Sequence, residues 1–159
     1  MAQNTTLFTI PKDSLIKCHN LIKDYKFNDF DIEYFDDTTT MFSMNSINFD
    51  NKYIFDEIKK IYSYSEIPFI NIDNMTVQYT KYNIKDEYII KPHKDNCQNT
   101  IIIYLDKDPN IKETFIVSDK EINGSDLWSH GGLIMTNELM HSGKYIGTGT
   151  REILCLFYD

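Results

Sequence analysis

The sequence predicts an α+β fold in which helices pack on an antiparallel β-barrel or on a double-sheet jelly roll. The first half of the chain contains two segments whose apolar residues recur with helical spacing. From about Asn74 onward, short runs rich in β-branched and aromatic residues follow one another at close intervals. A length of 159 residues is sufficient for one domain with a substantial core. We therefore expect a single domain, with a helical support region over 1–73 and a jelly-roll core over 74–159.

The two expected helices lie within residues 10–25 and 50–64. Pro11 stands where the first turn of a helix tolerates proline, and Asp50 is a candidate N-cap of the second helix. Each segment places apolar residues on one face, which we interpret as a contact with the core. These residues are Leu15, Cys18, Ile22 and Tyr25 in the first helix, and Ile54, Ile58 and Ile61 in the second.

The later runs are expected to be strands because β-branched and aromatic residues fit a half-buried pleated surface. They cover residues 75–82, 87–91, 99–106, 113–117, 131–136 and 151–158. The segment 139–157 also has the pattern of a strand, a glycine-bearing turn and a second strand. We expect this segment to form an antiparallel pair that returns Arg151 beside His141.

The composition argues against several classes of protein. A net charge of −8 opposes binding to nucleic-acid backbones, which requires clustered positive charge. No apolar run approaches the length of a membrane span, and the N-terminus lacks the order of a signal peptide. The three cysteines lie far apart without a CxxC pair, which fits a reducing compartment. We therefore expect a cytoplasmic protein with no membrane segment, and the charge disfavours a nucleic-acid partner.

Three residues far apart in the chain form a candidate iron site. His93 and Asp95 stand two positions apart, so both side chains point to the same side of an extended strand. His141 would supply a third ligand from a distant strand. Two histidines and one carboxylate on one face form the facial triad that holds Fe(II) and leaves positions open for a cosubstrate and dioxygen. The alternative for His141 is a histidine that is only hydrogen-bonded within the fold.

Arg151 is the only arginine among sixteen lysines and arginines. A guanidinium binds a carboxylate through two parallel hydrogen bonds and stays charged when partly buried, whereas a buried lysine loses its proton more readily. A dicarboxylate that chelates iron through one end leaves a free carboxylate at its other end, inside the barrel. Arg151 is our candidate to bind that carboxylate. The alternative is that Arg151 is the partner in a buried salt bridge.

The order HxD, distal histidine and a basic residue ten positions later resembles the Fe(II)/2-oxoglutarate-dependent dioxygenases. Within that superfamily the chain is similar to the prolyl and lysyl hydroxylase group. Three segments carry the similarity: "QYTKYNIKDEYIIKPHKDN", "TIIIYLDKDPNIKETFIV" and "GGLIMTNELMHSGKYIGTGTREILCLFYD". The resemblance runs from about Met75 to the C-terminus. It implies a double-stranded β-helix, a cupin-like jelly roll, with iron at one mouth and the N-terminal helices packed on one sheet.

The resemblance also implies roles for individual residues. The three candidate ligands fall on the family's iron ligands, and Arg151 falls on the residue that binds the distal carboxylate of the cosubstrate. Tyr104 matches a tyrosine that hydrogen-bonds the same carboxylate, and Tyr82 matches one near the iron-side end of the cosubstrate. Ile102 is expected to wall the cosubstrate pocket. Thr100 shares the face of Ile102 and Tyr104, because side chains alternate along a strand.

The implied activity is hydroxylation of an amino-acid side chain, a prolyl or lysyl residue of a polypeptide substrate, with release of succinate and CO2. Fe(II), 2-oxoglutarate and O2 are the implied cofactor and cosubstrates, with ascorbate as a reductant. Lys112 and Lys85 stand where the group usually has glycine. The spacing from Tyr88 to His93 is closer to that of the lysyl enzymes. The target residue therefore stays open, and the sequence does not predict an oligomeric state.

Two alternative functions remain from the sequence alone. Nucleic-acid oxidative demethylases of the same superfamily share the order of ligands, but they commonly carry a second arginine in the last strand, which this chain lacks. A non-catalytic jelly-roll binding module is the other alternative, and the intact set of ligands with Arg151 counts against it. His130 has no partner at a suitable spacing. We interpret His130 as a loop residue, His19 as an exposed or capping residue of the first helix, and Trp128 as a packing residue.

Overall fold

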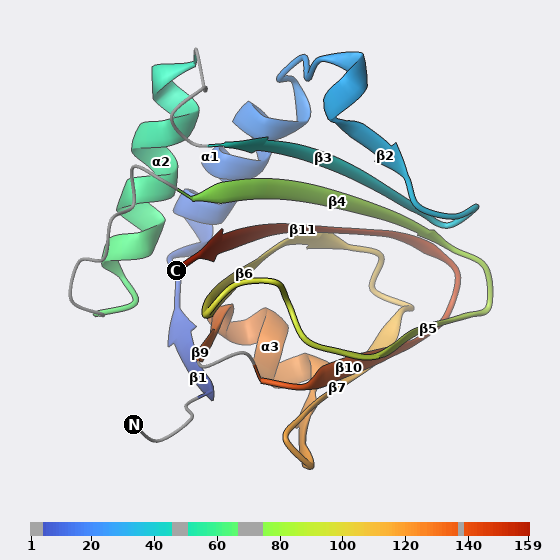
Figure 1. Ribbon diagram of the computed structural model, residues 1–159. Coiled ribbons are helices and arrows are strands. Elements are labelled where there is room, and N and C mark those ends of the chain that lie inside the picture. Colours follow the sequence, from blue (N-terminus) through green and yellow to red (C-terminus); the bar gives the residue numbers. More distant parts are fainter. Residues whose placement is uncertain (1–4, 46–50, 67–74, 137–138) are drawn as a thin grey trace.

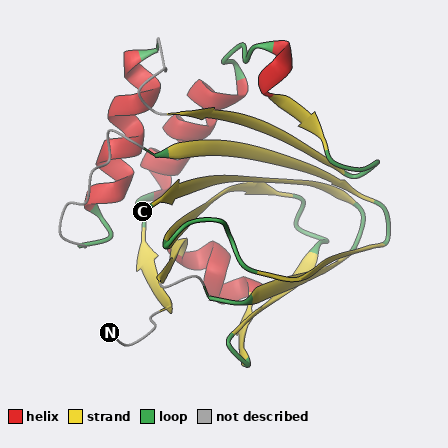
Figure 2. Ribbon diagram, viewed as in Figure 1, coloured by secondary structure: helices red, strands yellow, loops and turns green. Residues whose placement is uncertain are grey.

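Two antiparallel β-sheets face each other, and helices cover the outer face of the larger sheet (Figures 1 and 2). The structure, a computed structural model, describes residues 5–45, 51–66, 75–136 and 139–159. The larger sheet has the spatial order β1 (Thr5–Thr9), β9 (Gly131–Thr136), β6 (Asn99–Lys107), β11 (Gly149–Tyr158), β4 (Thr76–Ile84), β3 (Thr39–Asn45) and β2 (Ile32–Tyr34). The smaller sheet has the order β5 (Glu87–His93), β10 (His141–Ile146), β7 (Lys112–Val117) and β8 (Lys120–Asn123). This arrangement confirms the predicted α+β jelly roll of the double-stranded β-helix type.

Both predicted helices are present and both pack on the larger sheet (Figure 1). They are α1 (Lys12–Lys23) and α2 (Lys52–Ser63), and their predicted apolar faces are buried except that Tyr25 follows the end of α1. Asn51 caps α2, since its side chain accepts hydrogen bonds from the backbone N–H groups of Tyr53 and Ile54. The predicted cap Asp50 lies outside the described residues. A 3-10 turn, η1 (Asp29–Asp31), and a short helix, α3 (Gly124–His130), were not predicted.

The first part of the chain also contributes three strands that the sequence did not predict. These are β1 at one edge of the larger sheet and the pair β2 and β3 at the other. The strand β1 is too short to show a pattern, and its place depends on a distant contact: a Cβ atom added to Gly132 would lie 2.4 Å from the ring of Phe8. The predicted boundary between the two regions, at residues 73 and 74, lies outside the described residues.

The alternation of side chains along β11 separates two apolar clusters. Leu154 and Leu156 belong to the cluster between the larger sheet and the helices. Ile153 and Cys155 belong to the cluster between the two sheets. Arg151 has the same parity as Ile153 and Cys155, and it lines the cavity between the sheets. The pleat of one strand thus directs the only arginine of the chain into the interior.

The predicted pairing of β10 with β11 was wrong. The two strands lie in opposite sheets: β10 pairs with β5 and β7, and β11 pairs with β4 and β6. Gly147 begins the connection and Gly149 begins β11, and their φ angles of 136° and 141° lie in the region that favours glycine. The glycines therefore carry the chain across from one sheet to the other instead of closing a hairpin. His141 and Arg151 reach the same interior from facing sheets.

Cys18, Cys97 and Cys155 are free and buried. Burial raises the pKa of the Cys155 thiol to about 12, so this thiol is protonated at neutral pH. Among the described residues, the structure contains no helix with the length and apolar character needed to cross a membrane.

Replacement of Leu154 by alanine tests the packing between the larger sheet and the helices. The side chain is 0% exposed, so Leu154→Ala should lower the free energy of unfolding by about 3 kcal/mol through lost burial and a residual cavity. Urea denaturation followed by circular dichroism measures this loss. Ile16→Ala is the matched control, because Ile16 is 58% exposed and its loss should change the stability by no more than about 0.5 kcal/mol. An equal effect at both positions would contradict the assignment of this core.

Candidate active site

A cavity of about 620 Å³ lies between the two sheets. All eight residues that the sequence indicated as candidates line it. Phe35 and Ile89 also line the cavity although 59% and 56% of their surfaces are exposed, so the cavity opens between β5 and the connection from β2 to β3. One end of the cavity holds His93, Asp95 and His141, and the other holds Arg151.

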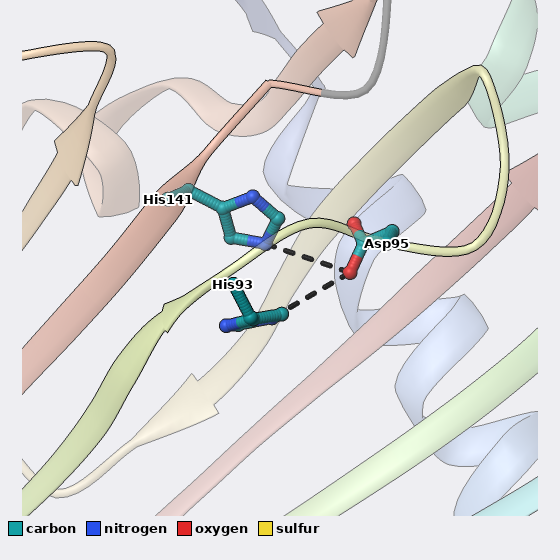
Figure 3. Close-up of side chains that lie close together, drawn as sticks. All are labelled: His93, Asp95 and His141. Carbon is teal, nitrogen blue, oxygen red and sulfur yellow. Dashed lines mark ion pairs between the residues drawn. The ribbon is translucent and has the colours of Figure 1, made fainter.

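The imidazoles of His93 and His141 converge on the carboxylate of Asp95 (Figure 3). The Nε2 atoms of His93 and His141 lie 3.6 Å and 3.5 Å from Asp95 Oδ1. These separations exceed those of good hydrogen bonds but approach the spacing of neighbouring ligands around one ion. One ligand atom from each residue lies within 4.8 Å of the others. Two imidazoles and one carboxylate in this arrangement suit a divalent transition metal with open coordination positions.

Backbone carbonyl groups orient both imidazoles. The Nδ1 atom of His93 lies 2.8 Å from the carbonyl oxygen of Lys91, and Nδ1 of His141 lies 2.8 Å from that of Leu139. A carbonyl oxygen can only accept, so each Nδ1 carries the proton and donates it. In the neutral imidazole Nε2 is then the nitrogen with the lone pair, which is the tautomer that a metal ligand requires.

The pairing of two strands brings the three side chains together. His93 ends β5 and lies directly opposite His141, the first residue of β10, while Asp95 follows in the turn after β5. Thr100 Oγ1 donates a hydrogen bond of 2.6 Å to Asp95 Oδ2. Burial raises the pKa of Asp95, but the contacts with His141, His93 and Thr100 outweigh it and hold the pKa below its usual range. Asp95 is therefore a carboxylate at neutral pH, oriented with Oδ1 toward the histidines.

Aromatic rings enclose the guanidinium of Arg151 at the other end of the cavity. Its Cζ atom lies 4.3 Å from the ring centre of Tyr145, 5.0 Å from that of Tyr82 and 5.9 Å from that of Tyr104. Tyr145 takes this position because Gly143 has no side chain: a Cβ atom there would lie 2.6 Å from the Tyr145 hydroxyl. Tyr82 thus lies beside Arg151, at the end of the cavity opposite to the one where the resemblance places it.

Arg151 already has a carboxylate partner in the structure. Its Nε atom donates to Glu113 Oε1 at 3.0 Å, and its Nη2 atom donates to Glu113 Oε2 at 2.9 Å. The side chains of Arg151 and Glu113 are 3% and 1% exposed. Burial alone would lower the pKa of Arg151, but Glu113 raises it well above its ordinary value, so the guanidinium stays charged. The alternative interpretation of Arg151, a buried salt bridge, is therefore what the structure contains.

The salt bridge leaves donors of Arg151 available for a second carboxylate. Among the described residues, Nη1 of Arg151 is one of the few buried side-chain atoms without a hydrogen-bond partner. A guanidinium has five N–H groups, and its Nη1 and Nη2 atoms form a fork separate from the Nε and Nη2 edge that Glu113 occupies. Arg151 lines the cavity and Glu113 does not. The residues present at this end therefore fit the distal carboxylate of a keto-diacid.

Sequence reasoning missed Glu113 and Tyr145 as parts of this end of the cavity. The sequence predicts only that Glu113 lies within a strand. In the structure Glu113 lies on the same buried face of β7 as Phe115 and Val117. An acidic residue on an apolar strand face predicts a buried cationic partner, and the chain offers one arginine. The sequence also contains an indication of the position of Tyr145. Gly143 lies two positions before this aromatic residue and leaves space on the same strand face.

The remaining polar candidates have structural roles outside the cavity. Trp128 Nε1 donates a hydrogen bond to Glu113 Oε1. The ring centres of Trp128 and Tyr104 lie 5.2 Å apart. His130 ends α3 and is not a loop residue. His19 lies on α1, 15% exposed, with Nε2 3.2 Å from Glu152 Oε2, so it is neither exposed nor a cap. These contacts join α3 and α1 to the sheets.

Solved structures share the fold at low sequence identity. A prolyl-4-hydroxylase of Pseudomonas putida has a TM-score of 0.56 and 12% identity, covering 99% of this chain and 92% of that one. A putative oxygenase of Shewanella oneidensis has a TM-score of 0.58 and 11% identity over 99% and 81%. A Neurospora crassa protein in complex with alpha-KG and 5-formyluracil has a TM-score of 0.57 and 9% identity over 94% and 71%. No protein-family model and no curated protein matches the chain. The similarity shows that the fold is the double-stranded β-helix.

Proposed function

We propose that this protein is an Fe(II)- and 2-oxoglutarate-dependent dioxygenase that hydroxylates a prolyl or lysyl side chain of a polypeptide, with release of succinate and CO2. One observation carries the proposal. A single cavity holds two oriented imidazoles and an ionised carboxylate at one end and a charged guanidinium with a free donor at the other. A metal and the two ends of a keto-diacid require this combination of groups.

The two ends of the cavity would bind different groups. His93, Asp95 and His141 would hold the metal on one side and leave its other side toward the cavity. Arg151 would bind the distal carboxylate, with the Tyr104 hydroxyl as a second donor. When bound, Fe(II), 2-oxoglutarate and O2 would supply the oxidative chemistry, while the protein supplies orientation and exclusion of water.

The tyrosines keep the Arg151 end suitable for an anion. Burial raises the pKa of Tyr82 and Tyr104 well above the ordinary value, and it raises the pKa of Tyr145 to about 12. The phenols therefore stay neutral at physiological pH and add no negative charge to the pocket. Their rings also replace water around the guanidinium, which strengthens its attraction for a carboxylate.

The rim of the cavity supports a polypeptide substrate. Phe35 and Ile89 offer apolar surface at the opening, and Asp36 lines the cavity beside Phe35. The segment 29–37 around them contains acidic residues and no basic one. This charge favours a lysyl side chain or a basic segment over an acidic one.

Oxidation of a nucleobase is a second candidate. The fold similarity to the Neurospora crassa protein in complex with 5-formyluracil supports it, since the ligand of that complex is a base. The exposed ring of Phe35 at the rim offers a surface for stacking. The net charge of −8 opposes a long nucleic-acid strand, so this candidate is restricted to a free base or a short segment.

Replacement of His141 tests the metal end. His141→Ala should abolish tight binding of Mn(II), used anaerobically in place of Fe(II), because it removes one of three ligands. It should also abolish the succinate that the wild-type protein forms with Fe(II), ascorbate and 2-oxoglutarate. Calorimetry and succinate analysis measure the two effects, and His130→Ala is the control because that histidine lies in α3, outside the cavity lining. Tight metal binding without turnover on any substrate would instead favour the binding module.

Replacement of Arg151 by lysine tests the other end. Arg151→Lys should weaken 2-oxoglutarate binding by about 1–3 kcal/mol, because the ammonium cannot serve two carboxylates through separate forks. Calorimetric titration of the Mn(II)-loaded protein measures the change. The affinity for Mn(II) itself should stay that of the wild-type protein. Unchanged affinity for 2-oxoglutarate would remove the role proposed for Arg151.

A peptide library tests the substrate. Peptides with prolyl and lysyl residues in varied sequence contexts should gain one oxygen atom, detected by mass spectrometry, with succinate formed in equal amount. Basic contexts should react faster than acidic ones because the segment 29–37 at the opening is acidic. Methylated oligonucleotides and free pyrimidine bases are the comparison, and oxidation of these without oxidation of any peptide would support the second candidate.

A further inference from the structure

Residues of β11 and α3 enclose the side chain of Glu113. Arg151 of β11 donates two hydrogen bonds to its carboxylate, and Trp128 of α3 donates a third. Gly124 at the start of α3 leaves room for it, since a Cβ atom there would lie 2.7 Å from Glu113 Cγ. The side chain is 1% exposed. A carboxylate so enclosed stays where it is when a ligand enters the cavity.

The distal carboxylate would therefore share Arg151 with Glu113. Glu113 holds the Nε and Nη2 edge of the guanidinium from a position outside the cavity lining. The unpartnered Nη1 atom, with the second N–H of Nη2, remains for a group in the cavity. Arg151 and Glu113 together carry no net charge, so a ligand carboxylate would bring the group of three to a net charge of −1.

We propose that Glu113 sets the affinity of the cavity for an anionic group at Arg151, by neutralising most of the positive charge that the guanidinium would otherwise offer. The inference rests on the proposed function, because it concerns the distal carboxylate of the cosubstrate. Repulsion between two carboxylates on either side of one guanidinium weakens binding. Loss of the Glu113 charge also leaves the buried guanidinium without a counter-ion, and a bound carboxylate then restores one. Both effects make the same ligand bind more tightly when Glu113 is neutral.

The test compares two ligands in two variants. Glu113→Gln removes the charge with little change of shape, and Glu121→Gln removes the charge of an exposed residue of β8 as the matched control. The probes are 2-oxoglutarate and 2-oxopentanoate, which has a methyl group in place of the distal carboxylate. Anaerobic calorimetry of the Mn(II)-loaded proteins measures both affinities. Glu113→Gln should bind 2-oxoglutarate about tenfold more tightly than the wild-type protein and 2-oxopentanoate equally well, and Glu121→Gln should change neither.

In the absence of ligand, loss of the Glu113 charge should lower the stability of the protein. Glu113→Gln should unfold at a lower temperature than the wild-type protein, because Arg151 loses its counter-ion. The gain in melting temperature on addition of Mn(II) and 2-oxoglutarate should then exceed that of the wild-type protein. If the variant is unfolded without ligand, Mn(II) with 2-oxoglutarate should restore its circular dichroism, and Mn(II) with 2-oxopentanoate should not. A purely structural role of Glu113 would lower the stability without raising the affinity.

The outcomes separate this inference from the proposed function. Weaker or unchanged binding of 2-oxoglutarate by Glu113→Gln would overturn the inference, and so would an equal change for both probes. In either case the proposed function stands if Arg151→Lys weakens 2-oxoglutarate binding. If the Mn(II)-loaded wild-type protein does not bind 2-oxoglutarate, the proposed function fails and the inference fails with it.

Discussion

The interior of this protein is arranged around one buried charge. An unpaired guanidinium between two β-sheets would cost several kcal/mol of stability, so its surroundings must compensate. Glu113 supplies the counter-charge, and three tyrosine rings supply contacts that tolerate a cation. Two glycines leave space for this set: Gly143 beside Tyr145 and Gly124 beside Glu113. Residues on strands of both sheets and on α3 thus form the surroundings of the Arg151 side chain.

The strand β6 connects the end of the cavity that holds Arg151 with the end that holds His93, Asp95 and His141. Its residues Thr100, Ile102 and Tyr104 share one face. Thr100 orients Asp95 at one end, and Tyr104 lies beside Arg151 at the other. Four residues of extended chain span about 13 Å, which leaves a lined apolar passage between two polar ends. The cavity therefore combines fixed polar groups at its ends with neutral walls, as binding sites for small anions commonly do.

Much of the fold and of the site could be predicted because it depends on local patterns. The helical faces, the strand runs and the parity of β6 are visible in short windows of sequence. The i, i+2 spacing of His93 and Asp95 is equally local. Three features were missed or predicted wrongly, and two of them depend on distant contacts. The strand β1 is completed by Gly132, the carboxylate of Glu113 by Arg151, and the path from β10 to β11 by two glycines with positive φ. The partners of β1 and of Glu113 are far away in the sequence, whereas the two glycines are local and their positive φ values decided the path.

The crossing from β10 to β11 has a consequence for how the protein is made. Residues 141–158 supply an inner strand to each sheet, with β10 between β5 and β7 and β11 between β4 and β6. Neither sheet can close while this stretch is still inside the ribosome, however much of the preceding chain has emerged. Until residues 141–158 are available, β4, β5, β6 and β7 each lack one neighbouring strand, although β4 can pair with β3, β6 with β9 and β7 with β8. Closure of both sheets therefore depends on one stretch of chain, and the strand edges that it covers stay open to pairing with other chains until it is in place.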